Sequence, residues 1–132
     1  MIDRRSLLVA GLAVAGYFAS PAPSAAFKSR TFDPTAFEAA QRAGKPVLIE
    51  VAAPWCPTCK AQRPILSLLG KDPRFKDLVA FQIDFDTQKD LLRKFDVRMQ
   101  STLISFKGTK EVGRSTGDTN AASIEALLSK SI

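Results

Sequence analysis

Apolar positions along the chain follow two spacings, one typical of buried strands and one typical of helices with a single apolar face. Residues 47–52 are apolar at every position except Glu50, as expected of a strand that is covered on both faces. Between residues 60 and 69 the apolar positions recur at helical spacing, and they predict a helix that Gly70 ends. Residues 78–85 alternate in part and predict a second strand.

Shorter patterns complete the expected order of elements. In chain order they predict a helix that starts at Asp33-Pro34 and ends at Gly44, a short helical turn over 72–77, a helix over 87–95, strands over 102–106 and 111–115, and a helix over 120–129. Residues 107–110 lie between two strands and predict a hairpin. This order is typical of an α/β protein with a central mixed sheet flanked by helices on both faces.

The first 26 residues follow a different pattern. The basic pair Arg4-Arg5 precedes an apolar run over residues 7–19, and small residues with helix breakers come next. This arrangement predicts a signal peptide, and Ser24 and Ala26 place the cleavage before Phe27. The paired arginines resemble a twin-arginine signal, with a Sec signal as the alternative. The apolar run is shorter than the roughly 20 residues of a comfortable membrane span, so an uncleaved anchor is the less favoured interpretation.

Export and composition limit the classes of function. We expect a periplasmic protein in which residues 27–132 form one small domain, and disulfides persist in that compartment. The chain carries 19 Lys and Arg against 13 Asp and Glu, for a net charge of +6. The basic residues are interleaved with acidic ones and form no arginine-rich tract, so no nucleic-acid partner is predicted. We expect a monomer.

The chain contains two cysteines, Cys56 and Cys59, and no histidine. A structural disulfide would close too short a loop to gain much stability. Structural zinc needs about four ligands, so no metal site is predicted within one chain, although a site shared by two chains stays open. A Cys–His hydrolase is excluded because the base is missing. A dithiol at this spacing can close and reopen with little backbone movement, which favours a redox couple.

Glu50 is the charged residue of the apolar strand, and two hypotheses account for it. In the first, the strand lies at an edge and the carboxylate is in water. In the second, the acid is buried with a raised pKa and exchanges a proton with Cys59 through water. We favour the second because perturbed acids gather at functional sites.

At this point the chain resembles the thioredoxin family over nearly all of residues 27–132. The run Trp55–Lys60 (W-C-P-T-C-K) matches the active site of that family, and Pro64, residues 106–108 and Gly117 match further positions in the same order. The resemblance implies the thioredoxin fold and thiol–disulfide exchange, with Cys56 attacking and Cys59 resolving. It implies no cofactor other than the redox-active disulfide. Gly117 resembles a glycine that lets the backbone approach the active site.

The residues around the cysteines are expected to tune the couple. Pro57 has no N–H group to lose at a helix start, and Thr58 brings no charge. The most oxidising family members place a His between the cysteines, so we expect a less oxidising couple here. Lys60 adds mild positive potential. Trp55 is expected to be a partly exposed lid that shields the Cys56 thiol and contacts substrate.

The pattern departs from the family at two places. Ser101 occupies the position of the family's cis-proline, and a trans bond is expected because a cis bond without proline costs about 3–4 kcal/mol. Gln100 would then pair its backbone with the bound peptide. Three consequences of the missing proline are open. The loop relaxes, or the Ser101 hydroxyl donates a hydrogen bond to the Cys56 thiolate. In the third, the thiolates become open to a metal or an iron–sulfur cluster shared by two chains. Gln82 stands where the family often has a Lys that pairs with the buried acid.

The sequence therefore predicts an exported thiol–disulfide oxidoreductase, a reductase rather than a strong oxidase. Its partners would be cysteine-containing exported proteins and a membrane electron-transfer partner. The alternative is a binding module on the same scaffold that holds a metal or iron–sulfur cluster between two chains, or a client peptide, without turnover.

Overall fold

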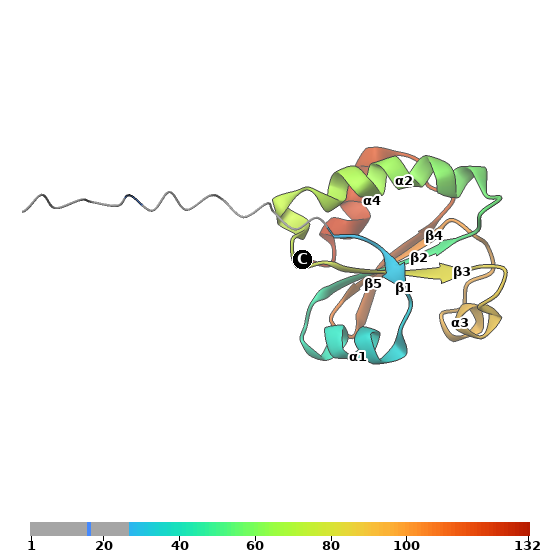
Figure 1. Ribbon diagram of the computed structural model, residues 1–132, viewed down its shortest axis with the longest axis horizontal. Coiled ribbons are helices and arrows are strands. Elements are labelled where there is room, and N and C mark those ends of the chain that lie inside the picture. Colours follow the sequence, from blue (N-terminus) through green and yellow to red (C-terminus); the bar gives the residue numbers. More distant parts are fainter. Residues whose placement is uncertain (1–15, 17–26) are drawn as a thin grey trace, which may run out of the picture.

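The computed structural model describes residues 27–132 together with Gly16 (Figure 1). The expected signal peptide, apart from Gly16, lies outside the described residues. The described chain forms a five-stranded sheet in the order β1-β3-β2-β4-β5. Its strands are β1 (Arg30–Thr31), β2 (Pro46–Ala52), β3 (Val79–Asp84), β4 (Thr102–Lys107) and β5 (Lys110–Thr116).

The sheet is mixed, as the sequence predicts. Strands β1, β3 and β2 are parallel, whereas β4 is antiparallel to both β2 and β5. The β4–β5 pair is the expected hairpin, and Gly108 in its turn has a φ of 58°. The sequence did not predict β1, because two residues are too few to show a period. Its pairing with β3 makes β3 an interior strand.

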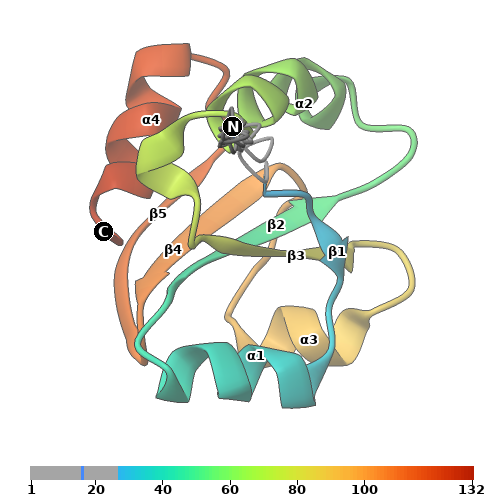
Figure 2. The ribbon, with the colours of Figure 1, turned by 60° about the vertical axis from the view of Figure 1, so that its left-hand side comes forward.

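The helices are α1 (Pro34–Arg42), α2 (Pro57–Gly70), α3 (Lys89–Lys94) and α4 (Ala121–Ser129), and a 3₁₀ turn covers Pro73–Phe75. Helices α2 and α4 cover one face of the sheet and α1 and α3 cover the other, as Figures 1 and 2 show. The predicted α/β fold with helices on both faces is therefore confirmed. None of the described helices is long and apolar enough to cross a membrane.

Local chemistry explains where several elements begin and end. Asp33 caps α1 by accepting a hydrogen bond from the Thr35 N–H group at 3.0 Å. Gly44 follows α1 with a φ of 70°, a conformation that glycine adopts without steric cost. Asn120 caps α4 by accepting from the Ser123 N–H group at 2.9 Å. These boundaries agree with the sequence prediction.

The apolar pattern over residues 60–69 covers only part of α2. The helix begins at Pro57, where the sequence analysis expects a helix start, so the second cysteine lies inside it. It continues through Gly70, and the cap is Lys71. A Cβ atom on Gly70 would lie 2.7 Å from the Phe27 carbonyl oxygen, so glycine is required here by close packing and does not act as a stop signal.

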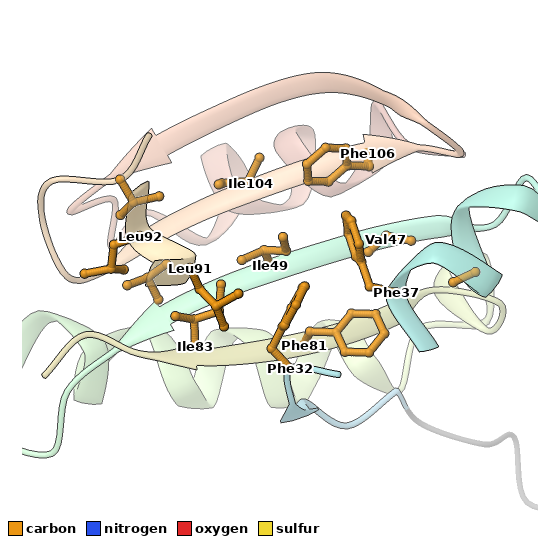
Figure 3. Packing of buried hydrophobic residues seen from close by; sticks show 13 residues of the cluster. Phe32, Phe37, Val47, Ile49, Phe81, Ile83, Leu91, Leu92, Ile104 and Phe106 are labelled. Carbon is orange, nitrogen blue, oxygen red and sulfur yellow. The ribbon is translucent and has the colours of Figure 1, made fainter. Parts of the chain in front are cut away.

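Two apolar clusters fill the layers on either side of the sheet. Figure 3 shows the cluster under α1 and α3, where Phe37 packs edge-on against Phe81 and Phe106, with centroids at 5.9 and 5.6 Å. The second cluster lies under α2 and α4 and includes Leu48. Alternate residues of β2 enter opposite clusters, which explains why this strand is apolar on both faces. Glu50 has the same parity as Leu48, and so it faces α2 and α4.

Candidate active site

The two cysteines lie where the central strand β2 passes into helix α2, and they are joined as a disulfide with Cα atoms 5.3 Å apart. Cys56 is the N-cap of α2, and its Sγ accepts a hydrogen bond from the Cys59 N–H group at 3.0 Å. Pro57 is the first helical residue, where its missing N–H group costs nothing. Sulfur at this position lies at the positive end of the helix dipole, which favours a thiolate on Cys56.

Burial does not separate the two cysteines. In the disulfide form Cys56 is 3% exposed and Cys59 is 2% exposed. Both pack with Ala52, Ala53 and Phe85. The roles of nucleophile and resolving thiol therefore rest on the helix terminus. Cys56 sits at the cap and accepts a backbone N–H group, whereas Cys59 lies inside the first turn.

Trp55 stands out from the site as a large exposed side chain, with 57% of its surface accessible. Its indole N–H group donates to a carboxylate oxygen of Asp86 at 2.9 Å, and its ring meets Phe85 edge-on at 6.5 Å. These two contacts hold the ring beside the disulfide while leaving much of it accessible. Of the tuning residues, Thr58 is half-buried and Lys60 is exposed.

Glu50 is buried in the central strand, with 7% of its surface exposed, and the edge-strand hypothesis is wrong. Burial raises the pKa of its carboxyl group, while a hydrogen bond donated by the Ser29 hydroxyl and the positive charge of Arg63 oppose that rise. Ala52, on the same face of β2, belongs to one apolar cluster with both cysteines. The acid therefore lies beneath α2 on the side of the disulfide. Proton exchange with Cys59 stays a prediction.

A pocket with a volume of about 320 Å³ opens onto Glu50 from the side of β1 and α2. Its lining residues are Phe27, Lys28, Ser29, Glu50, Arg63, Leu66, Ser67 and Gln82. Gln82 pairs with Glu50 across the β2–β3 ladder and brings no charge. The positive partner comes instead from Arg63 on α2, which the sequence prediction missed. The sequence signal for this partner was that Arg63 lies one helical turn beyond Cys59.

Ser101 adopts a left-handed backbone conformation, with a φ of 57°, and the Gln100–Ser101 bond is trans as expected. For a residue with a Cβ atom this conformation costs about 1–2 kcal/mol. The Ser101 N–H group donates to the Val51 carbonyl oxygen at 2.7 Å. The hydroxyl donates to the Gln100 carbonyl oxygen at 2.6 Å, so its hydrogen is already used and is not directed to Cys56.

Gly117 lies beside Ser101, and its N–H group donates to the Ser101 carbonyl oxygen at 3.0 Å. Its φ is 73°, and a Cβ atom added there would meet nothing within 4 Å. The expectation that glycine at this position lets the backbone approach the active site stays a prediction. Glycine is required by the backbone conformation, which turns the chain so that the two loops can be joined.

Gln62 is a buried polar residue that the sequence prediction missed. Only 1% of its surface is exposed, and it occupies the buried face of α2 between Cys59 and Leu66. Its side-chain amide donates to the Ser101 and Asp118 carbonyl oxygens, at 3.2 and 2.8 Å. A polar residue on the apolar face of a predicted helix was the signal that could have identified it.

The described residues 27–132 contain no group of three or more His, Cys, Asp or Glu side chains placed to hold a metal ion. The chemistry of the site consists of the Cys56–Cys59 couple, a buried acid beneath it, and two loops beside it. A CxxC disulfide at the start of a helix, after the central strand of a mixed sheet, defines a thiol–disulfide oxidoreductase of the thioredoxin fold.

Comparison with known proteins gives the family. Residues 28–130 match the family model described as Thioredoxin. A thioredoxin of Mycobacterium bovis is 36% identical over 85 residues, which cover 64% of this chain and 72% of the relative. A crystal structure of Trxlp from Edwardsiella tarda EIB202 has 42% identity and a TM-score of 0.74, over 76% of this chain and 98% of that one. The chain belongs to the thioredoxin family.

Proposed function

We propose that this thiol–disulfide oxidoreductase is an exported reductase of disulfides in other exported proteins. The observation that carries the proposal is Cys56 at the N-cap of α2, where its sulfur accepts the Cys59 N–H group. The neutral pair Pro57-Thr58 separates the cysteines and adds no positive partner for a thiolate. A modestly stabilised thiolate favours a reducing couple, because stronger stabilisation of the reduced form makes a better oxidant.

The exchange proceeds in two steps in which electrons and protons balance. The Cys56 thiolate attacks one sulfur of a substrate disulfide, forms a mixed disulfide and releases the first substrate thiolate. Cys59 then loses its proton and attacks the Cys56 sulfur, which closes the Cys56–Cys59 disulfide and releases the second substrate thiolate. Both released thiolates take up protons. The substrate gains two electrons, and the protein loses them.

Glu50 is the proposed acceptor of the Cys59 proton. A carboxyl group whose pKa is raised by burial is a better base near neutral pH than an exposed one. The pocket lined by Ser29 and Arg63 opens onto this carboxyl group, so the proton can pass on to solvent. The proposed sequence is therefore Cys59 to Glu50 to water.

A reductase needs a source of electrons at the site of export. We propose that a dithiol presented by a membrane protein reduces the Cys56–Cys59 disulfide after each turnover. The expected signal peptide, with its cut before Phe27, supports export. Trp55 directly precedes Cys56, and Met99 lies two residues before Ser101. Both side chains are exposed and offer apolar surface to both kinds of partner.

The experiment that tests the proposal is measurement of the reduction potential of Cys56–Cys59. The purified chain of residues 27–132 is equilibrated with glutathione buffers, and the alkylated thiols are counted by mass spectrometry. A reductase should have a potential near the roughly −270 mV of thioredoxins. A value nearer roughly −120 mV would make the protein an oxidant and contradict the proposal.

A trapping experiment tests the direction of attack. Replacing the resolving thiol, Cys59→Ser, should leave stable mixed disulfides between Cys56 and exported proteins, whereas Cys56→Ser should leave none. Mixed disulfides that form on Cys59 instead would reverse the assigned roles. Iron that co-purifies in proportion to a dimer would favour the cluster-binding alternative.

A further inference from the structure

The buried amide of Gln62 joins three segments that are far apart in sequence. Its Nε2 atom donates to the Ser101 carbonyl oxygen at 3.2 Å and to the Asp118 carbonyl oxygen at 2.8 Å. These acceptors lie 39 and 56 residues further along the chain. Both acceptors are backbone oxygens, so both positions need a donor. Among neutral side chains close to this size, an amide NH₂ group supplies two hydrogens from one atom.

The two loops that Gln62 holds are also joined to each other. The Ser101 carbonyl oxygen accepts a second hydrogen bond, from the Gly117 N–H group at 3.0 Å. Both residues of that bond have positive φ, at 57° and 73°. Ser101 holds this uncommon conformation although it carries a Cβ atom, and the surrounding hydrogen bonds stabilise it.

The Ser101 loop in turn reaches the redox couple through one backbone oxygen. The Val51 carbonyl oxygen accepts from the Ser101 N–H group at 2.7 Å, and the Cys59 Sγ atom lies 4.0 Å from the same oxygen. Cys59 and Gln62 lie three residues apart on the buried face of α2. The Ser101 loop is therefore joined to strand β2 through Val51, beside the Cys59 sulfur, and to the helix that carries both cysteines through Gln62.

We propose that Gln62 is a positioning residue for protein substrates. It holds the Gln100–Ser101 turn and the Gly117–Asp118 loop against the cysteine helix, in the arrangement with which an extended substrate segment pairs. The inference rests on the proposed exchange with protein disulfides. Gln62 touches neither the sulfurs nor the substrate, and it acts through the two loops.

The test compares Gln62→Met with a matched control, Gln41→Met. Gln41 is also partly buried and donates its side-chain amide to a loop carbonyl oxygen, that of Gly108 at 3.3 Å, in the β4–β5 turn at the other end of the sheet. Both variants remove amide hydrogen bonds and keep an unbranched side chain. Bovine insulin serves as the protein disulfide and DTNB (an aromatic disulfide) as the small one.

We expect Gln62→Met to raise KM for insulin about tenfold and to change kcat less than about twofold, because the loops no longer hold one arrangement. The rate with DTNB and the reduction potential should not change, since a small disulfide needs no pairing with the loops. Gln41→Met should leave all four quantities unchanged. Equal losses of activity with insulin and DTNB in Gln62→Met, or no change with either substrate, would overturn the positioning role.

Hydrogen exchange in the oxidised protein gives a readout that does not depend on activity. The N–H groups of Ser101 and Gly117 should exchange about tenfold faster in Gln62→Met than in wild type, with amides of β2 unaffected. Unchanged exchange would show that Gln62 does not hold the loops. A wild-type protein that fails to reduce insulin would refute the proposed function, and with it the substrate role, whatever the exchange rates.

A second variant keeps the test open if Gln62→Met does not fold. Gln62→Glu has the same size, and its ionised carboxylate cannot donate to the two carbonyl oxygens. Relative to wild type, exchange at Ser101 and Gly117 should therefore accelerate as pH rises and the carboxyl group ionises. A ratio to wild type that stays constant with pH would count against the proposal.

Discussion

At the scale of single residues, the site combines one buried acid with few charges to balance it. Glu50 lies in the central strand with its carboxyl group held by the Ser29 hydroxyl and approached by Arg63. Burial is the largest of these influences and raises the pKa, so the protonated form is favoured relative to an exposed acid. The acid therefore weakens the fold when it is ionised.

The pH dependence of stability follows from this shift. The folded protein binds the Glu50 proton more tightly than the unfolded chain does, so unfolding releases it at pH values between the unfolded and folded pKa. The contribution of Glu50 to stability is fully present below its ordinary pKa of 4.5 and is lost as pH rises through the raised folded pKa. Glu50→Gln should therefore gain stability relative to wild type as pH rises from acid to neutral.

Urea unfolding of both proteins at several pH values measures this difference. As pH rises, the unfolding free energy of Glu50→Gln should increase relative to that of wild type. The difference should level off above the folded pKa of Glu50. A difference that does not vary with pH would show that the Glu50 pKa is the same in the folded and unfolded states.

Glu50→Gln should also slow the resolving step with insulin by about a hundredfold, the lower end of the usual range for a lost acid–base group.

Arg63 gives a second prediction at this scale. Its guanidinium lowers the Glu50 pKa against the effect of burial, so Arg63→Ala should raise that pKa further. The carboxyl carbon of Glu50 can be titrated by NMR, and its midpoint should move to higher pH. Arg93→Ala, on α3 at the opposite face of the sheet, is the matched control and should leave the midpoint unchanged. A midpoint equal to wild type in both variants would remove Arg63 from the site.

At the scale of elements, α2 carries several unrelated tasks. The amino end of α2 presents Cys56 and Cys59, and its buried face places Gln62 under two loops. The carbonyl group of its last residue accepts a hydrogen bond from the N-terminal segment. The Phe27 N–H group donates to the Gly70 carbonyl oxygen at 3.0 Å, which joins the start of the described domain to the end of this helix. The helix therefore couples the redox site to the segment that lines the Glu50 pocket.

Gly70→Ala tests this junction. The new Cβ atom would lie 2.7 Å from a backbone oxygen, so the segment at Phe27 must move, and we expect the protein to lose about 1–3 kcal/mol of unfolding free energy. Gly113→Ala is a matched control, because its Cβ atom would meet a Leu127 side-chain carbon at 2.9 Å and that methyl group can move. Urea unfolding should show a larger loss of unfolding free energy for Gly70→Ala than for Gly113→Ala. Equal losses would mean that the backbone yields as readily as a side chain.

At the scale of the whole molecule, the two layers on either side of the sheet have different roles. The layer under α1 and α3 is built from packed aromatic rings and aliphatic side chains, as Figure 3 shows, and the cluster includes neither the cysteines nor Glu50. The side of the sheet under α2 and α4 contains the acid and the buried amide, and the disulfide lies at the amino end of α2. A fold with its site at one edge of the sheet can keep an apolar core and still bury polar groups near that edge.

Much of this arrangement could be predicted from the sequence, because its signals are local. The apolar period gives strand β2 and helix α2, Asp33 and Asn120 give two helix starts, and Gly44 gives a helix end. The spacing of the two cysteines, without any histidine, indicates redox chemistry. Neighbours within a few residues determine each of these features, so a reader of the sequence has all the information required.

Other features depend on residues that meet only in the folded chain. The sequence suggests that Gly70 ends a helix, yet its role is decided by Phe27, which lies 43 residues earlier and packs against it. Likewise Arg63 approaches Glu50 from a helix rather than from the neighbouring strand position, and Gln62 finds its acceptors in two distant loops.

The sequence by itself determined the redox couple, the order of helices and strands after β1, and the presence of an acid in the central strand. Tertiary structure alone decided which charge faces that acid, which amide holds the substrate loops, and why particular glycines are required. The physical reason is that the spacing of apolar residues and the capping of helices act through neighbouring residues. Burial, charge pairing and close packing depend on which segments the fold brings together.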